Sequence, residues 1–273
     1  MRCAIYSIRG CGAGRRLGVI LRTSDRATLL TFVALFVLTA AAWVAILRAP
    51  MGGDDMAGMQ MVMAPTARDA VAYVVAWAIM MAAMMLPSAL PMIGLYAAMQ
   101  RDAPSAATRM AAVTAFTAVY VTLWAITGVP IYFAGVALMA VTASTLAHTI
   151  AGVLIAAGIF QLSPLKHVCL RHCRSPLGFL LGHWRVGWRG GVRMGFAHAL
   201  YCLGCCWALM TVLVVAGAMG LPWVLLIACV VAAEKILPRG EWVARMTGVA
   251  LALLGVAVAI RPDLAVALRA PAM

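Results

Sequence analysis

Charged residues are scarce in this sequence, and acidic residues are the scarcest of them. Asp and Glu number 8 together, against 21 Lys and Arg, and charged residues make up only 11% of the chain. With 65% hydrophobic residues and a mean hydropathy of +1.01, the composition excludes an ordinary soluble domain and predicts an integral membrane protein. The net charge of +13 would suggest a nucleic-acid partner in a soluble chain. Membrane proteins instead collect cations in cytoplasmic loops, so we expect no nucleic-acid binding.

Two signals that would change the functional class are also absent. The chain has no G-x-x-x-x-G-K-[ST] run, so the sequence gives no support to ATP-driven transport. No A-x-A-type cleavage site follows the first apolar stretch, which indicates a retained first helix. We therefore expect the arginine-rich tail 1–28 to stay in the cytoplasm.

The apolar runs are long enough to cross a bilayer, which takes about 20 helical residues. They predict an all-α, polytopic transmembrane helix bundle of about seven spans within 29–262, followed by a short C-terminal tail, 263–273. The spans are expected near 29–47, 70–92, 110–137, 145–163, 194–218, 221–237 and 246–260. Between them lie a Met-rich outer loop, 48–69, and a basic inner loop with Cys and His, 164–193. In this topology the arginine-rich segments all fall on the same side of the membrane as the tail. This distribution indicates a cytoplasmic N-terminus.

The stretch HALYCLGCCW, 198–207, carries one histidine and three cysteines within an apolar helix. His198, Cys202 and Cys205 fall at about 0°, 40° and 340° around the helix, and Cys206 lies about 80° from His198. The first three side chains can therefore converge on one soft metal ion, which Cys206 reaches only if the helix rolls slightly. The alternative is that the cysteines pack as small hydrophobes and His198 bonds to a neighbouring helix. We favour the metal because a histidine inside a span is costly.

Methionine is the second unusual feature. Met80, Met81, Met84 and Met85 form a continuous stripe on one predicted helix, at about the same membrane depth as the cysteines. Thioethers suit Cu(I), although methionine is also an adaptable filler of helical bundles.

The inner loop contains KHVCLRHC, 166–173. If it is helical, Cys169, His172 and Cys173 share a face that looks into the cytoplasm, where Arg171 and Arg174 would lower the pKa of the thiols. A closed structural zinc site would need a fourth ligand. We expect these thiols to exchange metal with a partner while the primary site stays on the later helix.

One carboxylate, Glu234, falls inside a predicted span. It is expected to pair with the adjacent Lys235, to snorkel towards the inner surface, or to help move a proton or a metal ion.

Four strings of this sequence resemble a family of prokaryotic integral membrane proteins of unknown function that are predicted to bind metal. They are MMAAMMLPSALPM, QLSPLKHVCLRHCRSPLGFLLGHW, MGFAHALYCLGCCWALM and EKILPRG, and the resemblance runs from about 70 to 255. It implies a multi-pass protein of the bacterial inner membrane. It also implies that His198, Cys202, Cys205 and Cys206 match the suspected metal motif of the family.

These observations favour a non-enzymatic protein that binds or moves a soft metal ion, most simply Cu(I), with zinc as a second candidate. A secondary transporter, a channel and a copper-delivery chaperone remain open, each with a metal donor or acceptor protein as partner. A second hypothesis is a membrane thiol oxidoreductase linked to a quinone, because C-L-G-C has C-x-x-C spacing. A third is a structural or assembly factor of a larger membrane complex.

Overall fold

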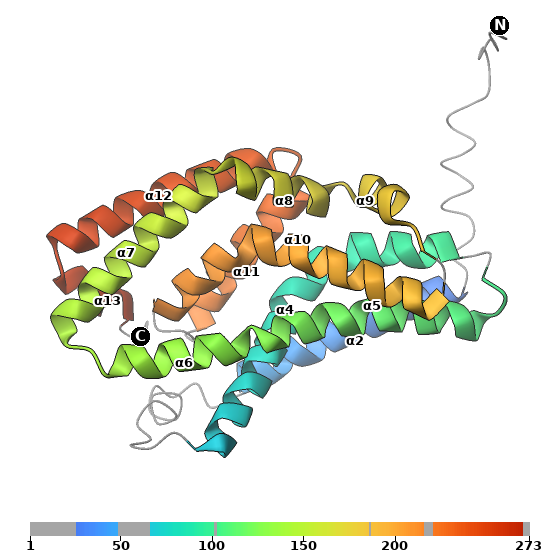
Figure 1. Cartoon of the computed structure of the whole chain (residues 1–273), viewed down its shortest axis with the longest axis horizontal. Helices are drawn as coiled ribbons and strands as arrows, with labels where there is room; N and C mark the ends of the chain where they lie inside the picture. The colour runs from blue at the N-terminus through green and yellow to red at the C-terminus, as the bar shows by residue number, and fades with distance from the viewer. Residues whose placement is uncertain (1–25, 49–65, 101–102, 186, 216–220, 270–273) are drawn as a thin grey trace, which may run out of the picture.

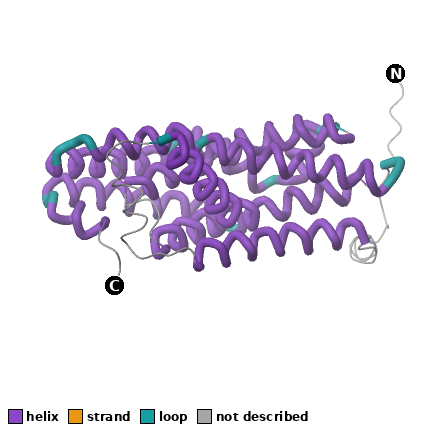
Figure 2. The backbone as a smooth tube through the Cα atoms, turned by 90° about the horizontal axis from the view of Figure 1, so that it is seen from below, coloured by secondary structure: helices purple, strands orange, loops and turns teal. Residues whose placement is uncertain are grey.

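The protein is all-helical. A computed structural model describes residues 26–48, 66–100, 103–185, 187–215 and 221–269, and no strand occurs among them. Its helices run mostly along the long axis of the molecule (Figure 2). The helices are α2 (Arg26–Arg48), α4 (Ala67–Met99), α5 (Ala106–Ile126), α6 (Gly128–Met139), α7 (Ala143–Leu162), α8 (Pro164–Arg174), α9 (Pro176–His183), α10 (Gly187–Val215), α11 (Leu221–Ile236), α12 (Gly240–Ile260) and α13 (Asp263–Arg269). The predicted all-α class is confirmed.

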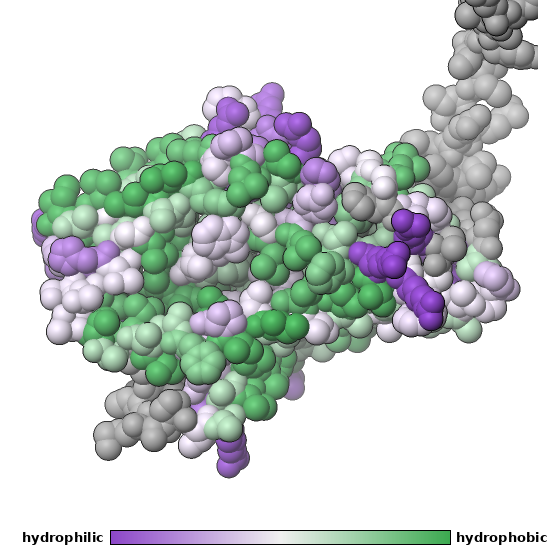
Figure 3. Space-filling view, viewed as in Figure 1, coloured by the Kyte–Doolittle hydropathy of each residue, from purple (hydrophilic) through white to green (hydrophobic). Residues whose placement is uncertain are grey.

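Over its described residues each expected span falls on helix, although 110–137 is divided at Thr127 into two helices and 216–218 lie outside the described residues. Only part of the set is long and apolar enough to cross a membrane. Five segments of the described chain meet that test: 67–99, 106–138, 144–162, 187–215 and 240–260. Phe32–Arg48 of α2 is a shorter apolar helical segment, and α11 has 16 residues. Apolar side chains cover most of the visible surface, and hydrophilic ones gather over the turn between α11 and α12 and near the start of α10 (Figure 3).

The region expected as a basic inner loop is largely helical. α7 ends at Leu162, and α8 starts directly afterwards because Ser163 caps it and Pro164 occupies its first turn. α9 follows, and α10 begins at Gly187, several residues before the predicted start of this span. The predicted C-terminal tail also contains a short helix, α13.

Glycines let α10 pack directly against the backbone of α5. A Cβ on Gly191 would collide with the carbonyl oxygen of Ala112, and one on Gly195 would lie 2.5 Å from the carbonyl oxygen of Phe116. Small residues permit such close approach between helices in membranes. The contact continues about one turn further along α5 and two turns further along α10, where Tyr120 lies beside Cys202.

The central helix α4 changes direction along its length (Figure 1). Pro87 and Pro91 both lie inside it, and each removes a backbone N–H donor from the helical ladder. Ser88 donates to the carbonyl oxygen of Met85 at 2.8 Å. The bend therefore lies next to the methionine stripe.

We expect Gly195→Val to destabilise the fold by at least about 2 kcal/mol, because the added side chain forces α10 away from α5. Thermal unfolding in detergent would measure this effect. The same substitution at Gly152, where a Cβ meets nothing within 4 Å, is the matched control and should cost much less. Equal losses for the two variants would contradict this account of the packing.

Candidate metal centre

Three thiols from two helices meet in the interior. The sulfur atoms of Cys173 on α8 and of Cys202 and Cys205 on α10 all lie within 4.8 Å of one another. The Cys205 sulfur is 3.8 Å from that of Cys173 and 3.3 Å from that of Cys206. Cys202, Cys205 and Cys206 are at most 1% exposed. We call Cys173, Cys202 and Cys205 the thiol cluster.

α8 reaches the cluster because α10 leaves room for it. A Cβ at Gly204 would lie 2.8 Å from the sulfur of Cys169, so the glycine leaves room for this side chain. Next to it, the ring of His172 stacks on that of Tyr201, with centroids 4.2 Å apart and planes within 3°. The face that carries Cys169, His172 and Cys173 thus packs on α10. All three residues are nevertheless partly exposed, and the expectation that this face looks into the cytoplasm stays a prediction.

The arginines of α8 do not lower the pKa of the Cys169 thiol as expected. Burial raises the pKa of the Cys169 thiol, and only nearby Lys166 opposes this effect. Arg174 points elsewhere and donates to the carbonyl oxygens of Leu237 and Pro238 at the end of α11, each at 2.7 Å. Arg174 therefore fastens α8 to the turn between α11 and α12.

A lysine and a tyrosine approach the cluster from the opposite side. The Lys235 ammonium of α11 donates to the Cys202 sulfur at 3.0 Å and to the Ser88 hydroxyl at 3.1 Å. The Tyr120 hydroxyl lies 3.1 Å from the same sulfur. Sequence reasoning missed Tyr120 and Ser88, which carry no motif, and read Lys235 only as a partner for Glu234.

His198 lies beside the thiol cluster but outside it. Its ring is stacked with those of Phe116 and Tyr120, and Phe179 meets it edge-on. Its Nδ1 is buried and has no hydrogen-bond partner among the described residues. The structure thus brings Cys202 and Cys205 together, as their spacing predicts, with Cys173 in the position that we expected for His198.

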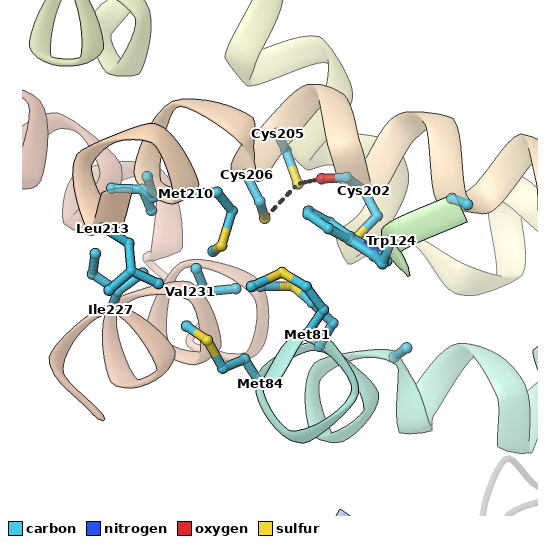
Figure 4. Close-up of a cluster of buried hydrophobic side chains, with 14 of the residues drawn as sticks. Met81, Met84, Trp124, Cys202, Cys205, Cys206, Met210, Leu213, Ile227 and Val231 are labelled. Carbon is cyan, nitrogen blue, oxygen red and sulfur yellow. Dashed lines mark hydrogen bonds between the residues drawn. The ribbon is translucent and has the colours of Figure 1, made fainter. Parts of the chain in front are cut away.

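The methionine stripe borders the same region. Met80, Met81, Met84 and Met85 are all buried. In Figure 4 the side chains of Met81 and Met84 extend from α4 toward Cys206 and Met210 on α10. The Met85 sulfur lies 4.0 Å from the Lys235 ammonium. Thioethers of α4 therefore face thiols of α10 across the interior, as the matching depths predict.

Glu234 pairs with a lysine distant in sequence and not with its neighbour Lys235. The Lys166 ammonium lies 2.6 Å from one carboxylate oxygen of Glu234, and the Gln161 amide donates to the other at 2.9 Å. All three side chains are at most 1% exposed. This buried network ties the α7–α8 junction to α11.

The donor set fits a soft metal ion. It consists of thiols with thioethers nearby, and the buried carboxylate is already paired. The six cysteines of the described residues are free, so their sulfurs are available as ligands.

A comparison with protein families adds independent support. The model of the family described as PpoB2, copper chaperone, matches residues 74–258. The chain belongs to this copper chaperone family. The matched range runs from α4 to α12 and contains every residue of the thiol cluster. No curated protein and no solved structure matches the chain.

For this family member we expect Lys166→Met to cost about 3–5 kcal/mol of unfolding free energy, because it leaves the buried Glu234 carboxylate without its cation. Chemical unfolding in detergent would measure the loss. Lys166→Met combined with Glu234→Gln should recover much of it. Arg261→Gln, which breaks the exposed Arg261–Asp263 pair, is the control and should cost at most about 1 kcal/mol. A Lys166→Met variant as stable as this control would contradict the assigned role.

Proposed function

We propose that this protein is a membrane-embedded copper chaperone that holds Cu(I) on Cys173, Cys202 and Cys205. The observation that carries the proposal is the meeting of three sulfur atoms from α8 and α10 within 4.8 Å, in a member of a copper chaperone family. Thiolates suit both Cu(I) and zinc, but structural zinc sites enclose the ion with four ligands in a tetrahedron, one more than the three thiols of this cluster. Cu(I) is thus the favoured cargo, with zinc as the competing ion.

The neighbouring sulfurs supply a path for exchange. Cys206 lies 3.3 Å from Cys205, and the thioethers of Met81 and Met84 belong to the same buried core, so the ion has further sulfur ligands near the cluster. Cys169 and His172 are partly exposed on α8, and we assign them to transfer with a soluble donor or acceptor protein. His198, with its unpartnered Nδ1, and Met80 and Met85 complete the proposed set of metal-handling residues.

We further propose that the protein spans a bacterial inner membrane about seven times, with α2 and α11 crossing alongside the five longer segments. The loops after α4, α8 and α11 then lie in the cytoplasm with the tail 1–28. The Met-rich loop 48–69 lies on the outer side, although residues 49–65 of it are outside the described part of the chain.

The redox hypothesis stays second because one observation favours it. Cys202 contacts the Lys235 ammonium at 3.0 Å, an arrangement that stabilises a reactive thiolate. Reactive pairs of such enzymes must meet a protein partner or a quinone, whereas Cys202 is fully buried. A metal-free purified protein with a reversible disulfide would favour this alternative.

We expect Cys173→Ser, Cys202→Ser and Cys205→Ser each to remove most of the bound copper, because each takes one ligand from the cluster. Elemental analysis of the purified proteins at equal expression would measure this. Cys206→Ser and Cys169→Ser should lower copper less. Cys229→Ser, at an exposed position of α11, is the control and should keep wild-type copper. Wild-type copper in all three cluster variants would exclude this site.

Reporter fusions would test the topology. We expect a reporter after residue 55 to read as periplasmic and one after residue 180 as cytoplasmic, because the arginine-rich segments stay inside. Opposite readings at both positions would reverse the direction of copper entry.

A further inference from the structure

The thiol cluster has a fixed cation in contact with it. The Lys235 ammonium lies 3.0 Å from the Cys202 sulfur, 3.1 Å from the Ser88 hydroxyl and 4.0 Å from the Met85 sulfur. The residue is 9% exposed. A buried ammonium is costly unless an anionic or strongly hydrogen-bonding group lies beside it.

No carboxylate of the described residues pairs with Lys235. Adjacent residues of a helix point about 100° apart, so Glu234 faces α7 and α8 while Lys235 faces α4 and α10. The two oxygens of Glu234 are occupied by Lys166 and Gln161. The thiol cluster is therefore the group that can offset the charge of Lys235.

We propose that Lys235 selects the charge of the bound ion and makes the cluster favour monovalent over divalent soft metals. This inference rests on the proposed copper site. The ammonium attracts the thiolates equally whichever ion they hold, but it repels the ion in proportion to the ion's charge. A divalent ion meets twice the repulsion of a monovalent one, and in a buried site neither water nor salt screens it effectively.

The position of Lys235 strengthens this effect. The Ser88 hydroxyl of α4 accepts from the ammonium, and the Tyr120 hydroxyl contacts the Cys202 sulfur at 3.1 Å. The cation and the ligand atom beside it are therefore both held in place. Ser88 itself is anchored to the backbone at the bend of α4 by its 2.8 Å bond to the Met85 carbonyl. Sulfur ligands alone would accept Zn²⁺ as well as Cu⁺, so the discrimination comes from the charge beside them.

Competition between metals in the full-length protein in detergent would test the proposal. Wild type and variants are equilibrated with chelator-buffered Cu(I) and Zn(II), and the ratio of bound zinc to bound copper is measured. Lys235→Gln, which removes the charge but keeps a polar side chain, should raise this ratio by at least about tenfold. Lys235→Arg keeps a cation and should stay near wild type. Ser88→Ala, which removes one hydrogen bond without changing charge, is the matched control and should shift the ratio much less.

An unchanged ratio in Lys235→Gln would overturn the proposal. If wild type binds no copper at all, the proposed function fails first, so the two failures are distinguishable. If Lys235→Gln does not fold, a displacement experiment on the wild-type protein tests the same proposal. Ag(I) should displace Cu(I) from the protein, whereas Cd(II), which is also soft but divalent, should not do so at equal free concentration. Displacement by Cd(II) as effective as that by Ag(I) would also refute selection by charge.

Discussion

The buried pair of Lys166 and Glu234 is the interaction on which the centre of this protein depends. It joins the start of α8 to the end of α11 in an interior where an unpaired charge is costly. Because α8 is held there, Cys173, two turns further along, can reach the cysteines of α10. Because Glu234 is occupied, the neighbouring Lys235 is left to the thiols. One ion pair thus positions a ligand and also the cation beside it.

Close approach of helices is the second requirement. Gly195 places α10 against the backbone of α5, and Gly204 admits the Cys169 side of α8. Small residues let helix backbones approach closely, and the van der Waals contacts made there help to hold the helices together. These glycines lie on α10, the helix that also carries Cys202 and Cys205. The packing of α10 therefore also sets the position of its thiols.

The arrangement suits a protein that takes up and releases copper. Thiols of α10 and α8 lie within 4.8 Å of one another, and the buried thioethers of α4 belong to the same core. Sulfur ligands in close succession allow an ion to exchange without being exposed to water. The membership of a copper chaperone family agrees with this chemistry.

The sequence by itself determined the helical class, the approximate positions of the long apolar helices and the shared face of Cys202 and Cys205, because these follow from apolar run length and the 3.6-residue period. It also predicted that four methionines form a stripe on one helix, level with the cysteines of another helix. Only the tertiary structure decided that Cys173 joins the cluster, that His198 lies in an aromatic pocket beside it and that Glu234 binds Lys166. These contacts depend on the turn of the chain at Ser163 and Pro164 and on the packing of α8 on α10. Local periodicity carries no information about which distant helix a side chain will meet.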